Sequence, residues 1–159
     1  MSVETIKKLY NFLNNLTPLV DDCGRICNHK CCKGEMNDGM LLLPGEKELL
    51  EQFDCYSFYY DEKYESDCVR CEGVCNRDFR PFSCRIFPYF IYKLNEESDI
   101  SIAPDIRAYN FCPLIDKKYS LNKKYLRNMR ICSKIIDSDE ELRKYFIKIS
   151  FLLTDFIDL

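Results

Sequence analysis

The spacing of cysteines near the N-terminus constrains this chain more than any other feature of its sequence. Four thiols fall within ten positions in the stretch Cys23-Gly-Arg-Ile-Cys27-Asn-His-Lys-Cys31-Cys32. One folded loop can aim the last three of them at a common centre. Because the sequence shows no sign of secretion, thiols at this density indicate metal binding rather than disulfides.

The first 20 residues bear on the compartment of the protein. They carry charged residues such as Glu4 and Lys7 in place of an apolar signal core. The 11 cysteines are an odd number, which would leave one thiol over in a fully disulfide-bonded chain. The apolar segment 146–157 contains Lys148 and Asp155 and is shorter than the roughly 20 residues that span a bilayer. We therefore expect a cytoplasmic protein with reduced thiols and no membrane partner.

Length and composition bound the fold and exclude one class of partner. The 159 residues, 47% hydrophobic and 31% charged, suit a single domain with its own core over residues 1–159. The net charge is −3. Because a phosphate backbone is held mainly by an excess of lysine and arginine, we expect no nucleic-acid partner.

Apolar residues recur every three or four positions at both ends of the chain, a spacing typical of helices that pack on a core. The first stripe runs from Val3 to Leu16 and stops at Pro18. The second covers residues 120–159, where Ser138-Asp-Glu-Glu141 has the pattern of a capping box that begins a new helix. We expect an N-terminal helix and a C-terminal hairpin of two antiparallel helices.

The middle of the chain predicts loops and short elements. Residues 21–40 show no periodicity, so we expect a loop there that needs metal to hold it. A short helix is expected over 46–53, a strand between 55 and 64, and a hairpin with arms at 89–94 and 100–103. The expected fold class is α+β: a mainly helical single domain with an irregular cysteine-rich metal-binding core and a small β-hairpin.

A second group of thiols follows at Cys68, Cys71 and Cys75. Two cysteines separated by two residues can turn both sulfurs toward one ion, and the intervening turn offers backbone N–H groups to the thiolates. Cys84 and Cys112 come later, each within a proline-containing motif. Two such clusters in one chain indicate a metal-binding protein.

These motifs resemble those of the YkgJ-type cysteine-cluster proteins, a family named for a CxxCxxCC motif and described as a zinc- or iron-chelating domain. The resemblance covers residues 23–113. It depends on Cys31-Cys32, Leu43-Pro-Gly-Glu46, Cys75, Arg80-Pro-Phe-Ser-Cys84-Arg-Ile-Phe-Pro88 and Cys112-Pro113. The first motif departs from the family pattern, because it reads C-x-x-x-C-x-x-x-C-C. The segment 27–34 is also similar to flagellin lysine methylases, which use S-adenosylmethionine and are associated with an iron–sulfur cluster.

Nine cysteines are candidate metal ligands: Cys23, Cys27, Cys31, Cys32, Cys68, Cys71, Cys75, Cys84 and Cys112. A closed zinc site and a [4Fe–4S] cluster each take four ligands, so two sites, or one site with spare thiolates, are both open. Zinc and iron are both open as the metal, as is the choice between Cys68 and Cys71. Nearby basic residues are expected to offset the thiolate charge: Arg25, Lys30, Lys33, Arg70, Arg77, Arg80 and Arg85.

Other reactive residues have simpler explanations. Cys55 and Cys132 are expected in the core, and His29, the only histidine, is expected to face solvent. The scattered glycines form no nucleotide-binding loop, and one histidine allows no Ser/His/Asp set.

We expect a metal-binding protein. A small enzyme related to the S-adenosylmethionine-dependent protein lysine methylases, and a protein-interaction or metal-handling module, are the alternatives. The sequence identifies no protein partner.

Overall fold

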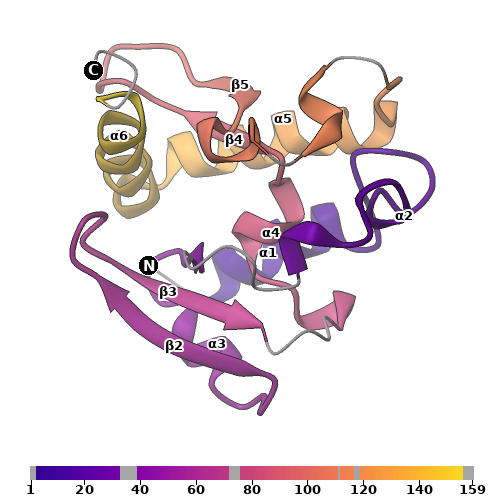
Figure 1. Cartoon of the computed structure of the whole chain (residues 1–159). Helices are drawn as coiled ribbons and strands as arrows, with labels where there is room; N and C mark the ends of the chain where they lie inside the picture. The colour runs from indigo at the N-terminus through magenta and orange to yellow at the C-terminus, as the bar shows by residue number, and fades with distance from the viewer. Residues whose placement is uncertain (1–2, 33–38, 72–75, 111, 117–118, 156–159) are drawn as a thin grey trace.

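Helices and two small antiparallel sheets share the chain in this computed structural model (Figure 1). The structure describes residues 3–32, 39–71, 76–110, 112–116 and 119–155. Cys75 lies outside the described residues, as does the side chain of Cys32. Helix makes up 48% of the structure and strand 16%, which confirms the expected mixed class.

Helix α1 (Val3–Leu13) follows the predicted stripe, because Ile6, Leu9 and Leu13 are its buried residues. It packs against α4 (Phe82–Ile86) and α5 (Lys123–Ser138). Cys132 of α5 is fully buried beside α1, with Sγ 3.9 Å from the carbonyl oxygen of Leu9. Its expected place in the core is confirmed.

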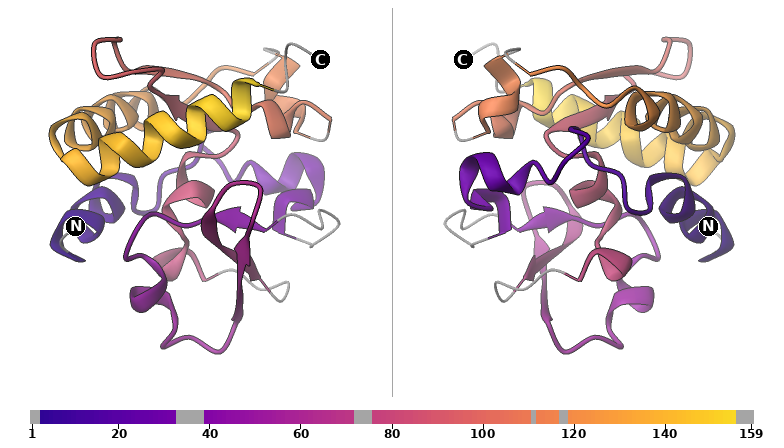
Figure 2. Two further views of the ribbon diagram at one scale, coloured as in Figure 1. Left: turned by 90° about the vertical axis from the view of Figure 1, so that its left-hand side faces the viewer. Right: turned by 90° about the vertical axis from the view of Figure 1, so that its right-hand side faces the viewer.

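The C-terminal segment forms two helices, α5 and α6 (Glu140–Thr154), as predicted. The cap of α6 is Asp139 rather than Ser138, because the Asp139 carboxylate accepts the backbone N–H of Leu142. The antiparallel arrangement is wrong: α6 is seen end-on in Figure 1 and from the side in Figure 2, whereas α5 shows the reverse. Asp139 alone separates the helices, which is too short a link to bring α6 back along α5.

The larger sheet has the strand order β1 (Met40–Leu41), β3 (Ser66–Cys71), β2 (Tyr56–Asp61), with every pair antiparallel. The aromatic run predicted β2. Strand β3 was not predicted, because its cysteines indicated a metal-binding turn. The helix expected over 46–53 is shorter in the structure, as α3 (Lys47–Leu50).

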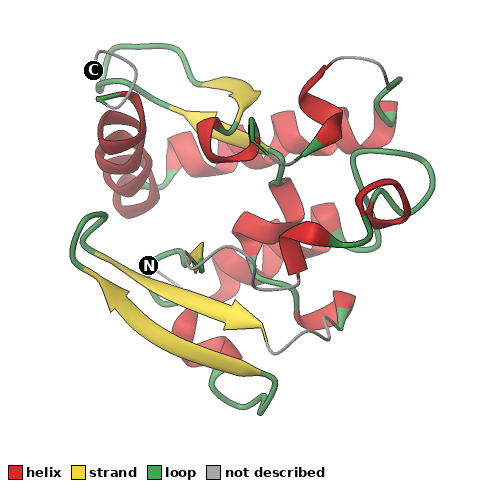
Figure 3. Cartoon of the chain, viewed as in Figure 1, coloured by secondary structure: helices red, strands yellow, loops and turns green. Residues whose placement is uncertain are grey.

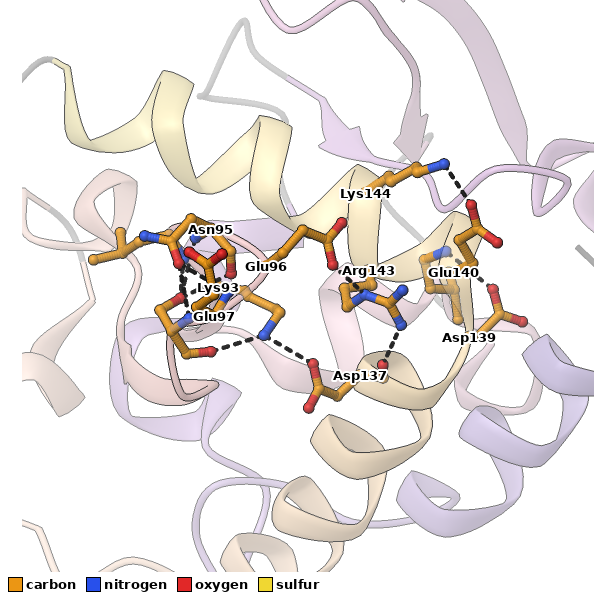
Figure 4. A network of polar contacts seen from close by, with 12 residues as sticks. Lys93, Asn95, Glu96, Glu97, Asp137, Asp139, Glu140, Arg143 and Lys144 are labelled. Carbon is orange, nitrogen blue, oxygen red and sulfur yellow. Dashed lines mark hydrogen bonds and ion pairs between the residues drawn. The ribbon is translucent and has the colours of Figure 1, made fainter.

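The smaller sheet is the predicted hairpin of β4 (Tyr89–Tyr92) and β5 (Ser101–Pro104), which packs on α5 and α6. Its turn is joined to the corner between the two helices (Figure 4). The buried Lys93 places Nζ 2.7 Å from the carbonyl oxygen of Ser98 and 3.0 Å from Asp137. Arg143 and Glu96 add a second contact, at 2.7 Å.

Helix α4 contacts both β1 and β4, and so lies between the two sheets (Figure 3). Its residues Phe82 and Ile86 belong to the main core. The remaining short helices lie in the connections: α2 (Gly24–Cys27), η1 (Lys30–Cys32), η2 (Arg77–Phe79), η3 (Ile106–Ala108) and η4 (Pro113–Asp116). Within the described ranges, no helix has the length and apolar character needed to cross a membrane.

Candidate functional site

Six of the nine candidate cysteines line one cavity of about 100 Å³. They come from five segments: the start and end of α2, η1, the end of β3, α4, and the position before η4. These residues are Cys23, Cys27, Cys31, Cys71, Cys84 and Cys112. The fold therefore gathers thiols from both sequence clusters and from the two later motifs at one place.

Cys68 does not belong to this group. It is 1% exposed, lies in the main hydrophobic core and pairs with Tyr59 across the sheet. Burial raises the pKa of the Cys68 thiol to about 11. Cys71, three positions later in the same strand, lines the cavity. The half-buried Cys55 packs against a small apolar cluster, as expected.

A close backbone turn shapes the α2 side of the cavity. Helix α2 is capped by Asn28, which has a left-handed φ of 53°, and the N–H of His29 donates to the carbonyl oxygen of Gly24 at 2.9 Å. A Cβ atom on Gly24 would lie 2.1 Å from Nδ1 of His29, so the His29 ring packs directly on this glycine. His29 is exposed, as expected, yet it also lines the cavity.

On the opposite side, the buried carboxylate of Glu46 holds the first turn of α4. Oε1 accepts the backbone N–H of Phe82 at 2.6 Å and the hydroxyl of Tyr10, while Oε2 accepts the N–H of Leu43 at 2.7 Å. Burial raises the pKa of Glu46, and these donors oppose that shift. The sequence placed Glu46 at a helix start and in one of the motifs of the family resemblance, but no local pattern indicates that its carboxylate positions Cys84.

Arg85 follows Cys84 in α4 and is also buried, at 3% exposure. Nε donates to the carbonyl oxygen of Arg80 at 2.6 Å, and Nη2 donates to that of Asp78 at 3.0 Å. The guanidinium lies over the ring of Tyr10, 4.2 Å from its centroid. Burial lowers the pKa of Arg85, while the nearby Tyr10 and Glu46 oppose that shift.

The thiols on the cavity wall influence one another. Burial raises the pKa of Cys23 to about 11, and Asp22, Cys112 and Cys27 raise it further. Burial also raises the pKa of Cys112, with a smaller effect from Cys27. In the metal-free protein, Cys23 and Cys112 therefore carry their protons at neutral pH, and a bound metal ion would have to displace them.

The donor set of this cavity fits zinc or an iron–sulfur cluster, because both are bound by cysteine thiolates. The volume of the cavity is larger than the roughly 10–15 Å³ that a single water molecule needs, so a metal ion fits inside it. Among the residues that the structure describes, no three His, Cys, Asp or Glu side chains are close enough to hold one ion. The described thiols thus surround a cavity without forming a closed coordination sphere.

Comparison of this chain with protein-family models, with curated proteins and with solved structures gives no match. The likeness to the YkgJ-type cysteine-cluster family, and the weaker one to the methylases, therefore stay predictions from the motifs.

Proposed function

We propose that this protein binds a metal through the thiolates that line the cavity, with zinc or an iron–sulfur cluster as the bound group. The observation that carries the proposal is that six cysteines, spread between positions 23 and 112 of the sequence, line a single cavity. Cysteines that serve only as small apolar side chains would be distributed through the core, as Cys68 and Cys132 are.

The ligands are expected to be drawn from these six residues, together with Cys32 and Cys75. Each thiol releases its proton on binding, so metal affinity falls as the pH is lowered. Zinc would tie the segments together, and an iron–sulfur cluster would in addition carry an electron. The basic residues of the wall, Arg70, Arg80 and Arg85, offset the charge that the thiolates acquire.

The first experiment is metal analysis and an absorption spectrum of the reduced protein, purified without oxygen. We expect zinc, or iron with sulfide, in a fixed ratio to protein. Cys84→Ser and Cys112→Ser should each lower that ratio, whereas Cys132→Ala, which removes a core thiol, should leave it unchanged. Substoichiometric zinc and iron in the fully reduced wild-type protein would falsify the proposal.

One observation favours an enzyme related to the S-adenosylmethionine-dependent methylases as the second candidate. The thiols surround open volume, which leaves room for a ligand beside a metal. Calorimetric titration of the metal-loaded protein with S-adenosylmethionine tests this alternative, and the absence of binding at millimolar ligand would remove it. Rapid transfer of the metal to a competing chelator would instead favour a metal-handling role.

A further inference from the structure

Helix α5 presents a basic face to solvent. Its cationic side chains are all exposed, and they are Lys123, Lys124, Arg127, Arg130 and Lys134. Those at positions 123, 127, 130 and 134 recur every three or four residues, so they lie above one another on one side of the helix. We call these four side chains the basic stripe. The opposite side of α5 carries the buried Tyr125, Met129 and Cys132.

The charge of the basic stripe has no counterpart nearby. No member of the stripe forms an ion pair with a residue in the described part of the chain. The carboxylate that α5 itself carries, on Asp137, pairs with Lys93. By contrast, Lys144 of α6 pairs with Glu140 one turn earlier. The residues that the structure describes therefore leave the stripe unbalanced.

This arrangement costs the fold free energy. Cations four positions apart on one side of a helix repel each other. Lys123 and Lys124 also lie in the first turn of α5, where the helix dipole disfavours positive charge and no acidic residue is present. The apolar contacts of the opposite side hold the helix, so its packing does not need the stripe. Binding of an anionic partner would offset the repulsion.

The stripe begins next to the thiol cavity. The backbone N–H of Asn122, the cap of α5, donates to the carbonyl oxygen of Pro18 at 2.8 Å. Pro18 is one of the residues that line the cavity. In Figure 1 this end of α5 is the one on the side of α2. A partner bound along the stripe would therefore lie beside the α2 side of the cavity wall.

The charge of the remaining chain decides which class of anion fits. Because α5 contributes +4 to a net charge of −3, the rest of the chain carries −7. A nucleic acid or an anionic bilayer extends well beyond one helix, and its phosphates would be repelled by that remainder. A protein segment can confine its carboxylates to the stripe, which is about 16 Å long at 1.5 Å per residue.

We propose that the basic stripe of α5 docks an acidic helical segment of another protein, whose carboxylates recur every three or four residues. Such a segment, lying alongside α5, brings one carboxylate to each cation of the stripe. The docking itself does not depend on a metal. On the proposed function, the docked protein would lie next to the metal site.

The probe is a synthetic alanine-based helical peptide with glutamates at positions i, i+4, i+7 and i+11. A matched peptide with glutamine at the same positions is the control. Fluorescence anisotropy with the full chain measures binding. We expect the glutamate peptide to bind, to bind several-fold more weakly when salt is raised from 20 to 200 mM, and to bind more tightly than the glutamine peptide. Equal binding of the two peptides, or none at millimolar concentration, would overturn the proposal.

Variants then assign the binding to the stripe. Arg127→Gln combined with Arg130→Gln should weaken binding of the glutamate peptide about tenfold, whereas replacement of both by lysine should keep most of it. The control is Lys144→Gln combined with Lys148→Gln on α6, which removes the same charge from cations that pair with carboxylates. Its affinity should stay close to that of the wild type. Equal weakening in the two glutamine variants would show that only net charge matters, and would contradict a site on α5.

Two further measurements separate this proposal from its rivals. A 20-base-pair DNA duplex and vesicles containing phosphatidylserine are titrated in the same way. Tighter binding of either, lost in the Arg127→Gln and Arg130→Gln variant, would overturn the assignment to an acidic protein. Metal content should be equal in all variants, because none of the replaced residues lines the cavity. If the wild type holds no metal, the proposed function fails, and the peptide titrations still decide whether α5 is a docking surface.

Discussion

Strand geometry sends the thiols of Cys68 and Cys71 to different surroundings. In an extended strand successive side chains alternate between the two faces, so residues three positions apart point to opposite sides. Cys68 accordingly lies in the core, and Cys71 reaches the cavity. A C-x-x-C pair on a turn would have placed both sulfurs at one ion, so the secondary structure decides which thiol is available.

This difference gives the first prediction. Cys71→Ser should lower metal content several-fold in protein purified without oxygen. Cys68→Ala should leave metal content unchanged and cost about 1–2 kcal/mol of unfolding free energy, because it only removes a buried side-chain atom. Metal analysis with urea unfolding measures both effects, and an equal loss of metal in the two variants would contradict the assignment of Cys71.

Glu46 carries the second prediction, because its carboxylate accepts three hydrogen bonds. Glu46→Gln replaces one acceptor oxygen by a donor, and should cost about 1–3 kcal/mol through a buried group left unsatisfied. Glu48→Gln, at an exposed position of α3, is the control and should have little effect on unfolding. Equal midpoints in urea for the two variants would show that the Glu46 carboxylate does not hold α4.

At the scale of elements, α4 depends on its surroundings. A helix of five residues has no stability of its own. Besides Glu46, its contacts include the hydroxyl of Ser83, which donates to the carbonyl oxygen of Leu41, and that of Tyr125, which donates to the carbonyl oxygen of Ile86 at 2.5 Å. Cys84 and Arg85 are therefore positioned by residues far away in the sequence.

The third prediction concerns this support. Tyr125→Phe removes the donor to Ile86 at a fully buried position, and should cost about 1–3 kcal/mol of unfolding free energy. Because α4 loses a contact at its end, metal should also be released faster to a chelator. Tyr60→Phe is the control, since Tyr60 is 58% exposed. If Tyr125→Phe left both the unfolding free energy and the rate of metal release unchanged, this explanation of how α4 is held would be wrong.

The corner between the hairpin and the two helices gives the fourth prediction (Figure 4). Asp137→Asn removes the charged partner of the buried Lys93 and should cost about 1 kcal/mol, a value reduced by the partial exposure of Asp137. Metal content should stay the same, because this corner does not line the cavity. The exposed Glu140–Lys144 pair provides the control: Glu140→Gln should not change the unfolding midpoint.

For the molecule as a whole, the sequence predicted the parts that depend on local periodicity. Helices α1, α5 and α6 and the β4–β5 hairpin follow from residues close in sequence. The crossing of α6 over α5 was missed, because it depends on packing rather than on either stripe.

The candidate site was also predicted only in part from the sequence. Spacing identified the six thiols of the cavity, but could not exclude Cys68, whose neighbour Tyr59 comes from another strand. Glu46 and Arg85 gain their roles only through long-range contacts with Tyr10 and the start of α4. No local pattern specifies such contacts.

The last prediction is tested by metal removal. Since binding energy in a thiol-rich region is also folding energy, removal should lower the unfolding midpoint. Amide exchange should increase most in the segments that line the cavity, 22–31 and 112–114, and least in α5. A uniform increase along the chain would indicate that the metal does not act at the cavity.

The cysteines that line the cavity extend along the sequence from the start of α2 to Cys112. The cavity can therefore be completed only late in the synthesis of the chain. A nascent chain that has emerged only as far as α2 and η1 presents three of the six thiols, with no β3, α4 or η4 to face them. On the proposed function, metal loading is then a late event, which follows the emergence of residue 112 from the ribosome.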